Sequence, residues 1–148
     1  MSEPVGQSRR ISEAVPPIAD LKALAHVDRL RILASLRLDG TSTATRLGRR
    51  LGLNSGATSY HLRRLAAHGF IEADPELGNG REKWWRARHE STRYDTAELS
   101  GDQLETGLAF TQAVLSAHAA MMQRALQHYR DLPVAWRSAS TASDVIIP

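Results

Sequence analysis

Small, hydroxyl-bearing and cationic side chains recur at helical spacing in the middle of the chain. They are Ser55, Gly56, Ser59, Tyr60 and Arg63. Small residues in a first helical turn let the backbone approach a surface closely, and the free amides and helix dipole there favour phosphate. Serine, tyrosine and arginine side chains one turn further along can reach base edges or backbone oxygens of a nucleic acid. This side of the predicted helix, residues 54–67, is therefore a candidate nucleic-acid surface.

The opposite side of the same predicted helix is apolar. Thr58, Leu62, Leu65 and Ala66 share that side, so we expect it to pack against the core. We expect His61 to be a partly buried packing residue rather than a residue that reads bases. One helix thus has one face for packing and one face for a ligand.

Basic residues are concentrated around this helix. Residues 43–88 contain nine basic and four acidic side chains, a formal charge of +5, whereas the whole chain carries +3. Arg64 and Lys83 are further candidate contact residues within this basic segment. Such a patch fits a polyanionic partner, although a merely solvated arginine-rich surface would have the same charge.

Several classes of protein do not fit the sequence. The absence of cysteine excludes disulfides, thiolate metal sites and cysteine nucleophiles. No nucleophile elbow, phosphate-binding loop or metal-ligand cluster is found, so we expect neither an enzyme nor a cofactor. The N-terminus lacks the apolar centre of a signal peptide, and no run approaches the ~18 apolar residues of a membrane span. We expect a cytoplasmic protein without a membrane partner.

The elements around the candidate surface can be placed from periodicity and capping residues. Short helices are expected over 18–25, 27–38 and 43–51, the last with Thr43 as its N-cap and Gly52 as a left-handed C-cap. Asn54 should cap the helix that follows. Residues 70–74 and 81–87 should pair as a hairpin, with Trp85 in the core and Trp84 against the terminal helix. The predicted fold is mainly α with a small β-hairpin wing.

Three stretches in this order resemble the ArsR-like winged helix-turn-helix transcriptional regulators. They are "LKALAHVDRLRILASL", "TATRLGRRLGLNSGATSYHLRRLAAHGFIE" and "GREKWWRA", within residues 18–89. The resemblance implies that residues 54–67 are the recognition helix, residues 43–52 the supporting helix and the hairpin the wing. It places Ser55, Gly56, Ser59, Tyr60 and Arg63 in a DNA groove and Arg81 on the wing. The chain departs from the family at His26-Val27, where many members have Asp-Pro, and at Arg46, where many have an acid.

The resemblance also implies a homodimer built on terminal helices. We expect a flexible arm over 1–16, the winged domain over 17–90, a linker over 91–99, a dimerisation helix over 100–132 and a tail over 133–148. The expected dimer residues are apolar and lie at helical spacing. They are Leu21, Leu24, Leu104, Leu108, Leu115, Met122 and Leu126.

No metal site is predicted, and zinc is not expected to control DNA affinity; the terminal helix is the place where the family would suggest one. Some family members bind zinc there through two histidines eleven positions apart, whereas His118 and His128 are ten apart, which turns one ring ~80° from the other's face. The residue expected to be an acid is Ser116. A small-molecule effector stays open, because nothing in the sequence specifies one.

The sequence therefore predicts a dimeric, sequence-specific regulator that binds a palindromic operator in double-stranded DNA and acts as a repressor. The alternative is a winged-helix interaction module whose basic face meets an acidic protein. The operator, the regulated genes and the role of the tail are not specified by the sequence.

Overall fold

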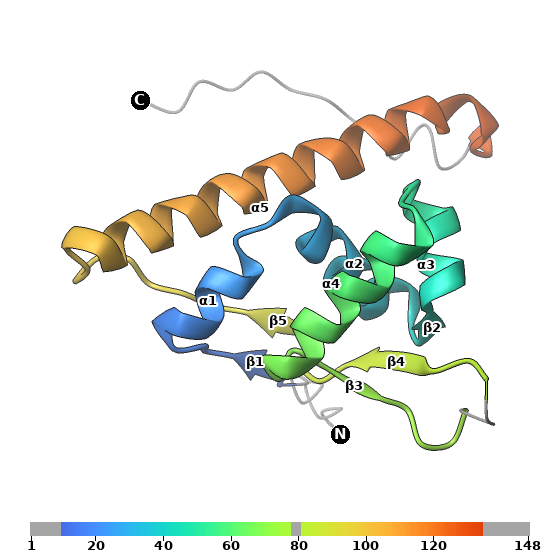
Figure 1. Cartoon of the computed structure of the whole chain (residues 1–148). Coiled ribbons are helices and arrows are strands. Elements are labelled where there is room, and N and C mark those ends of the chain that lie inside the picture. Colours follow the sequence, from blue (N-terminus) through green and yellow to red (C-terminus); the bar gives the residue numbers. More distant parts are fainter. Residues whose placement is uncertain (1–9, 78–80, 135–148) are drawn as a thin grey trace, which may run out of the picture. The chain divides into compact units, whose positions relative to one another are not determined.

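The computed structural model describes residues 10–77 and 81–134 (Figure 1). The chain divides into two compact units, Met1–Ala117 and His118–Pro148. The helices are α1 (Ile18–Leu24), α2 (Val27–Asp39), α3 (Ala44–Leu51), α4 (Ser55–Ala67) and α5 (Gly101–Gln127), followed by the 3-10 turn η1 (Tyr129–Asp131). The strands are β1 (Glu13–Ala14), β2 (Ser42–Thr43), β3 (Ile71–Ala73), β4 (Trp84–Ala87) and β5 (Ser91–Thr92). This is the predicted fold, a winged helix-turn-helix with a long C-terminal helix.

One hydrophobic core holds the first unit together. Phe110 of α5 packs against it, and Trp85 is buried in it as the alternation along β4 predicts. Its buried members come from the first four helices, from the sheet and from Phe70, which directly precedes β3. They are Leu24, Ile32, Leu33, Leu36, Leu47, Leu62, Leu65, Phe70, Ile71 and Trp85.

Local hydrogen bonds fix the ends of α3 and α4, which lie side by side in Figure 1. The Thr43 hydroxyl accepts from the backbone N–H of Arg46 at 3.2 Å. Gly52 ends α3 with φ 71° and ψ 31°, a left-handed conformation that glycine adopts without strain. The Asn54 side chain then accepts from the N–H of Ala57 at 2.8 Å. All three predicted caps are confirmed, so the turn between the two helices is set by its own residues.

Gly48 allows α3 to lie against this turn. A Cβ atom at Gly48 would lie 2.9 Å from the backbone oxygen of Leu53 and 3.3 Å from Oγ1 of Thr58. The Leu53 N–H donates to the Gly48 carbonyl at 2.9 Å, so the two segments are also hydrogen-bonded at the point of contact. The approach of the two helices therefore depends on the missing side chain.

The sheet that carries the wing is antiparallel, in the order β2-β4-β3. Ile71 of β3 pairs with Ala87, and Ala73 pairs with Trp85, which forms the predicted hairpin. Ser42 of β2 pairs with Trp85 on the other side of β4. The sequence did not predict β2, because a strand of two residues has no periodicity to detect.

The expected flexible arm is partly ordered. Strand β1 pairs in parallel with β5, so that Glu13 lies opposite Ser91 and Ala14 opposite Thr92. The Arg93 side chain also donates to Glu13 at 2.8 Å. Residues 12–14 and 90–93 are thus paired with each other rather than lying in a free arm and a plain linker. The rest of the expected arm, residues 1–9, lies outside the described residues.

Two further expectations need correction. Helix α5 ends at Gln127 and is followed by η1, whereas the sequence predicted one helix as far as residue 132. Leu21 and Leu24 have exposed fractions of 0%, so they pack inside their own chain and offer no side-chain surface to a partner. Most of the expected tail, residues 135–148, lies outside the described part. Among the residues that the structure describes, no helix has both the length and the apolar character needed to cross a membrane.

Candidate nucleic-acid interface

Helix α4 has the two faces that its sequence predicts. Thr58, Leu62 and Leu65 are buried, with exposed fractions of at most 1%. The other side of the helix is open to solvent, except that Ser59 is half-buried. Its exposed members are Ser55, Gly56, Tyr60, Arg63 and Arg64.

The start of α4 suits an anion. Neither α3 nor α4 has an acidic residue in its first turn, so neither helix neutralises the positive end of its dipole with a carboxylate of its own. At Gly56 a Cβ atom would meet only the Asn54 side chain, at 3.6 Å, so the backbone here is accessible from outside. A phosphate or a base edge can therefore approach the backbone of α4 at this point.

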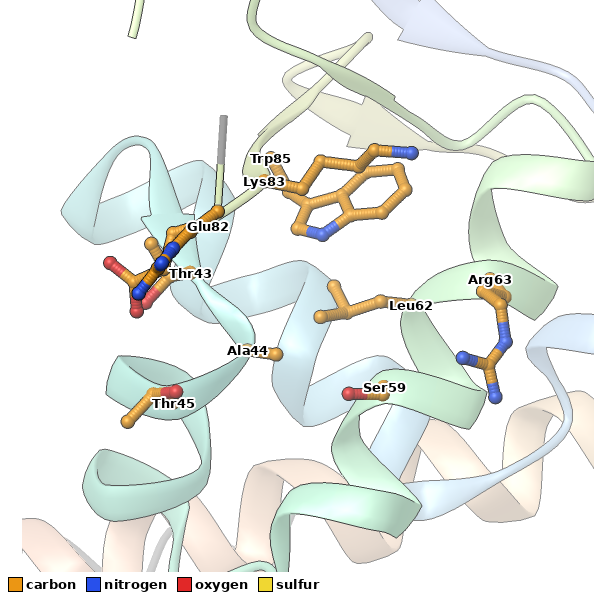
Figure 2. Close-up of a pocket in the computed structure, with 10 residues that line it drawn as sticks. Thr43, Ala44, Thr45, Ser59, Leu62, Arg63, Glu82, Lys83 and Trp85 are labelled. Atoms are coloured by element: carbon orange, nitrogen blue, oxygen red, sulfur yellow. The ribbon is translucent and has the colours of Figure 1, made fainter. Parts of the chain in front are cut away.

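Residues of α4 and of the wing line the same depression (Figure 2). Its volume is about 310 Å³, and Ser59 and Arg63 of α4 line it together with Arg81 and Lys83 of the wing. Thr43 and Thr45, at the start of α3, and the acid Glu82 also contribute. The structure thus brings together four of the predicted contact residues, which lie up to 24 positions apart in the sequence. Three cations face one acid there.

Ion pairs divide the basic residues of the middle segment into two groups. Arg86 and Arg88 both contact Glu72, at 3.0 and 3.8 Å, and Arg50 contacts Asp39 at 3.3 Å. Arg63, Arg64, Arg81 and Lys83 form no ion pair with any residue that the structure describes. Arg46 and Arg49 of α3 are likewise exposed and without an ion pair among the described residues, so the cations available to a polyanion lie on α3, on α4 and at Arg81 and Lys83 of the wing.

Cations also cover the tryptophans of β4. The Arg46 guanidinium lies 4.7 Å from the centroid of the Trp84 ring, and the Lys83 ammonium lies 5.2 Å from that of Trp85. The sequence predicted that Trp84 packs against the terminal helix, but the structure gives it a partner on α3. This contact fixes the base of the wing against the supporting helix.

A network that the sequence did not reveal lies behind Tyr60. Arg29 of α2 donates through Nε to Nδ1 of His61 at 3.2 Å and through Nη1 to the carbonyl of Ala23 at 2.9 Å. Its guanidinium is 5.9 Å from the Tyr60 ring centroid. The His61 ring is also 4.5 Å from the ring of His26. Arg29 thus links the start of α2 to the exposed face of α4.

The surroundings of His61 favour its neutral form. Burial, followed by the neighbouring His26 and Arg29, lowers the pKa of His61, which favours the uncharged ring that accepts from Arg29. Burial and the nearby Arg64 lower the pKa of Arg29. The expectation that His61 is a packing residue is confirmed by its exposed fraction of 7%. Its partner Arg29 lies 32 positions away in the sequence, and no helical or strand periodicity relates residues so far apart.

Comparisons with known proteins agree with this geometry. Residues 29–72 match the model of a family described as winged helix-turn-helix DNA-binding. The matched segment runs from Arg29 through α3 and α4 into β3, and β4 follows it in the structure. The searches of curated proteins and of solved structures returned no match. Residues 29–72 are thus similar to this family of DNA-binding domains, and the helices and strands around them have the winged helix-turn-helix arrangement.

Proposed function

We propose that this protein is a homodimeric, sequence-specific DNA-binding regulator of the ArsR-like kind that represses transcription by occupying a palindromic operator. The observation that supports it best is the depression shared by α4 and the wing. Arg63 on the helix and Arg81 and Lys83 on the wing line it together, and none of them is paired with a described acid. A DNA backbone lying between helix and wing would contact all three.

Each part of the surface has its own task in this proposal. The small residues Ser55 and Gly56 let the start of α4 enter the major groove. Tyr60 and Arg63 lie one and two turns further along and reach base edges, where arginine favours guanine. Arg64, Arg81 and Lys83 contact phosphates, which positions the domain without reading sequence.

The dimer in this proposal forms through α5. Five apolar residues fall within about 40° around that helix, and four of them have exposed fractions of 50–70%. Such a narrow stripe is typical of a helix that pairs with another helix. A two-fold axis through it would present two recognition helices to major grooves about 34 Å apart. The stripe consists of the half-buried Leu104 and the exposed Leu108, Leu115, Met122 and Leu126.

Repression is the mode that needs no contact beyond the DNA. A dimer that covers two half-sites within a promoter excludes polymerase by occupancy alone. The second half-site contact is intramolecular once the first has formed, which raises the affinity for a palindrome over that for a single half-site.

Selection of bound duplexes from a random pool tests sequence specificity. The selected duplex and a scrambled one are then compared by fluorescence anisotropy at physiological salt. Arg63→Ala should cost about 1–3 kcal/mol on the selected duplex only. Arg81→Ala should weaken both duplexes alike and lower the log–log salt slope by about 0.9. The control is Arg124→Ala, which removes an exposed arginine of α5 that has no part in the proposed DNA contact. Equal affinity of the unmodified protein for both duplexes would refute sequence specificity.

Analytical ultracentrifugation tests the dimer. The double variant Leu115→Glu, Met122→Glu places two charges in the stripe, so it should sediment as a monomer and lose most of its operator binding. The matched control is Gln112→Glu, Gln123→Glu, which adds two charges beside the stripe at other exposed positions of α5. A stripe variant that remains dimeric with unchanged affinity would show that the dimer forms elsewhere.

A further inference from the structure

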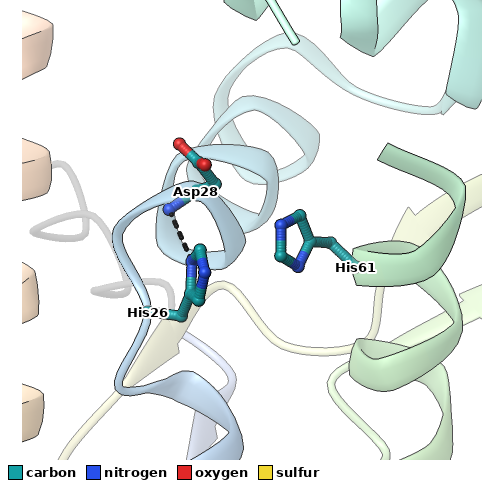
Figure 3. A group of neighbouring side chains, drawn as sticks. All are labelled: His26, Asp28 and His61. Carbon is teal, nitrogen blue, oxygen red and sulfur yellow. Dashed lines mark hydrogen bonds between the residues drawn. The ribbon is translucent and has the colours of Figure 1, made fainter. Parts of the chain in front are cut away.

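Two histidines and an aspartate meet where the start of α2 lies against α4. His26 caps α2, Asp28 stands in its first turn, and His61 projects from the buried side of α4 (Figure 3). Each of the three offers a ligand atom, and these atoms all lie within 4.8 Å of one another. His26 and Asp28 are half-buried, so an ion can reach the cluster from solvent. No other such cluster of three is found among the described residues.

We propose that His26, Asp28 and His61 bind a divalent transition-metal ion of the zinc class. Two imidazoles and one carboxylate are a donor set that suits this class, and water would complete the coordination. Bonds of about 2.0–2.1 Å in a tetrahedron put ligand atoms about 3.3 Å apart, so the side chains close by at most about 1.5 Å on binding. Side-chain rotation of His26 and Asp28 can supply that movement.

Metal binding exchanges two hydrogen bonds for coordination. Nδ1 of His61 accepts from Arg29 at 3.2 Å, and Nδ1 of His26 accepts from the Asp28 amide at 3.1 Å. If the metal binds Nδ1 of either ring, the group that donates to that nitrogen, Arg29 or the Asp28 amide, loses its acceptor directly. If it takes Nε2, the neutral ring carries its proton on Nδ1 and no longer accepts there. Arg29 is therefore released from His61 whichever nitrogen coordinates the metal.

Positive charges around the cluster should lower its affinity for a metal ion. Asp28 is paired with Arg31 at 3.2 Å, and the Arg31 guanidinium is also held by the Leu51 carbonyl at 2.8 Å. Arg29 and Arg64 add positive charge on the side of α4. These arginines repel the bound metal ion, so we expect micromolar binding rather than the much tighter binding of a dedicated structural zinc site.

Occupancy would act on the recognition helix, a consequence that rests on the proposed function. Arg29 lies close to the Tyr60 ring as well as to His61. Its release removes the support behind Tyr60, so metal should weaken operator binding. This differs from the terminal-helix zinc site that the spacing of His118 and His128 disfavours, because it uses different residues and a different element.

The first test is metal binding by the full chain without DNA. Zinc is titrated into chelator-treated protein in competition with a chromophoric chelator, and ring nitrogens of the histidines are followed by long-range ¹H–¹⁵N spectra. We expect one ion per chain and shifts of the His26 and His61 ring signals. His61→Gln keeps an acceptor for Arg29, and His26→Asn keeps an N-cap, so each removes a ligand while preserving the local hydrogen bond. Each should lower zinc affinity at least tenfold.

The matched controls are His118→Gln and His128→Gln, which remove exposed histidines of the C-terminal segment and should leave zinc affinity unchanged. Circular dichroism establishes that the variants are folded. The site is disproved if zinc up to about 100 µM leaves the His26 and His61 signals unmoved, or if folded His61→Gln and His26→Asn bind zinc as the unmodified chain does.

Operator binding with and without zinc is the second, separate measurement. We expect zinc to lower the operator affinity of the unmodified protein tenfold and to leave that of His61→Gln unchanged. Zinc binding with unchanged operator affinity would refute the coupling through Arg29 but not the site, and failure to bind any operator would refute the proposed function while leaving the first test intact.

Discussion

Replacement of Gly48 by alanine should show how closely the two helices of the helix-turn-helix must approach. The new Cβ would lie 2.9 Å from the Leu53 carbonyl oxygen, so one of the two segments has to shift by several tenths of an ångström. Neither neighbour moves freely, because Leu53 is hydrogen-bonded to Gly48 and the Thr58 hydroxyl donates to the Asn54 carbonyl at 2.8 Å.

The magnitude follows from two opposing terms. Overpacking of a close contact costs about 1–3 kcal/mol. Alanine in place of glycine gains about 0.4–1 kcal/mol, because the unfolded chain loses conformational freedom. We therefore expect Gly48→Ala to lower the free energy of unfolding by about 1 kcal/mol, equivalent to a fall in Tm of about 2–4 °C for a chain of this size.

Gly56→Ala is the matched control, because it makes the same substitution in the neighbouring helix where the nearest contact is 3.6 Å away. The gain from restricting the unfolded chain is common to both variants, so the difference between their free energies of unfolding isolates the steric cost of about 1–3 kcal/mol. Urea denaturation followed by circular dichroism measures both. If Gly48→Ala is as stable as Gly56→Ala, the two helices do not depend on the missing side chain.

Three further predictions concern the same surface. Gly56→Ala should weaken operator binding several-fold in anisotropy titrations without loss of stability, and unchanged binding would mean that the backbone does not approach the DNA there. Asn54→Ala should cost about 1 kcal/mol in urea denaturation, because the Ala57 amide loses its acceptor, whereas Asn54→Asp should cost little; equal losses would argue against the cap. Arg46→Ala should lower stability by about 0.5–1 kcal/mol and alter tryptophan fluorescence through Trp84, and the exposed Arg49→Ala on the same helix should do neither.

Local signals in the sequence were sufficient for the centre of the fold. Thr43, Gly52 and Asn54 lie within a few residues of the groups that they cap, so residue type and position predict their roles. The buried face of α4 follows from the periodicity of Leu62 and Leu65, which depends on the helix alone.

Features that depend on tertiary packing could not be predicted in this way. Strands β1, β2 and β5 are two residues long and exist because of their partners. The contact of Arg29 with His61 joins two helices through side chains that no short-range pattern relates. The burial of Leu21 and Leu24 within their own chain could not be predicted either, because an apolar helix face does not reveal whether its own chain or a second copy covers it.

The short pairing of β1 with β5 has a consequence for folding kinetics. Ser12 and Glu90, whose groups flank this pairing, are 78 residues apart. Closing so long a loop is entropically costly until the intervening helices have formed, and a two-residue ladder offers few bonds in return. The pairing should therefore form last and open first, while α2, α3 and α4 remain folded. The amide hydrogens of Glu90 and Arg93 would then exchange with solvent ahead of those in α4, and each such opening would detach the segment before α1 without global unfolding.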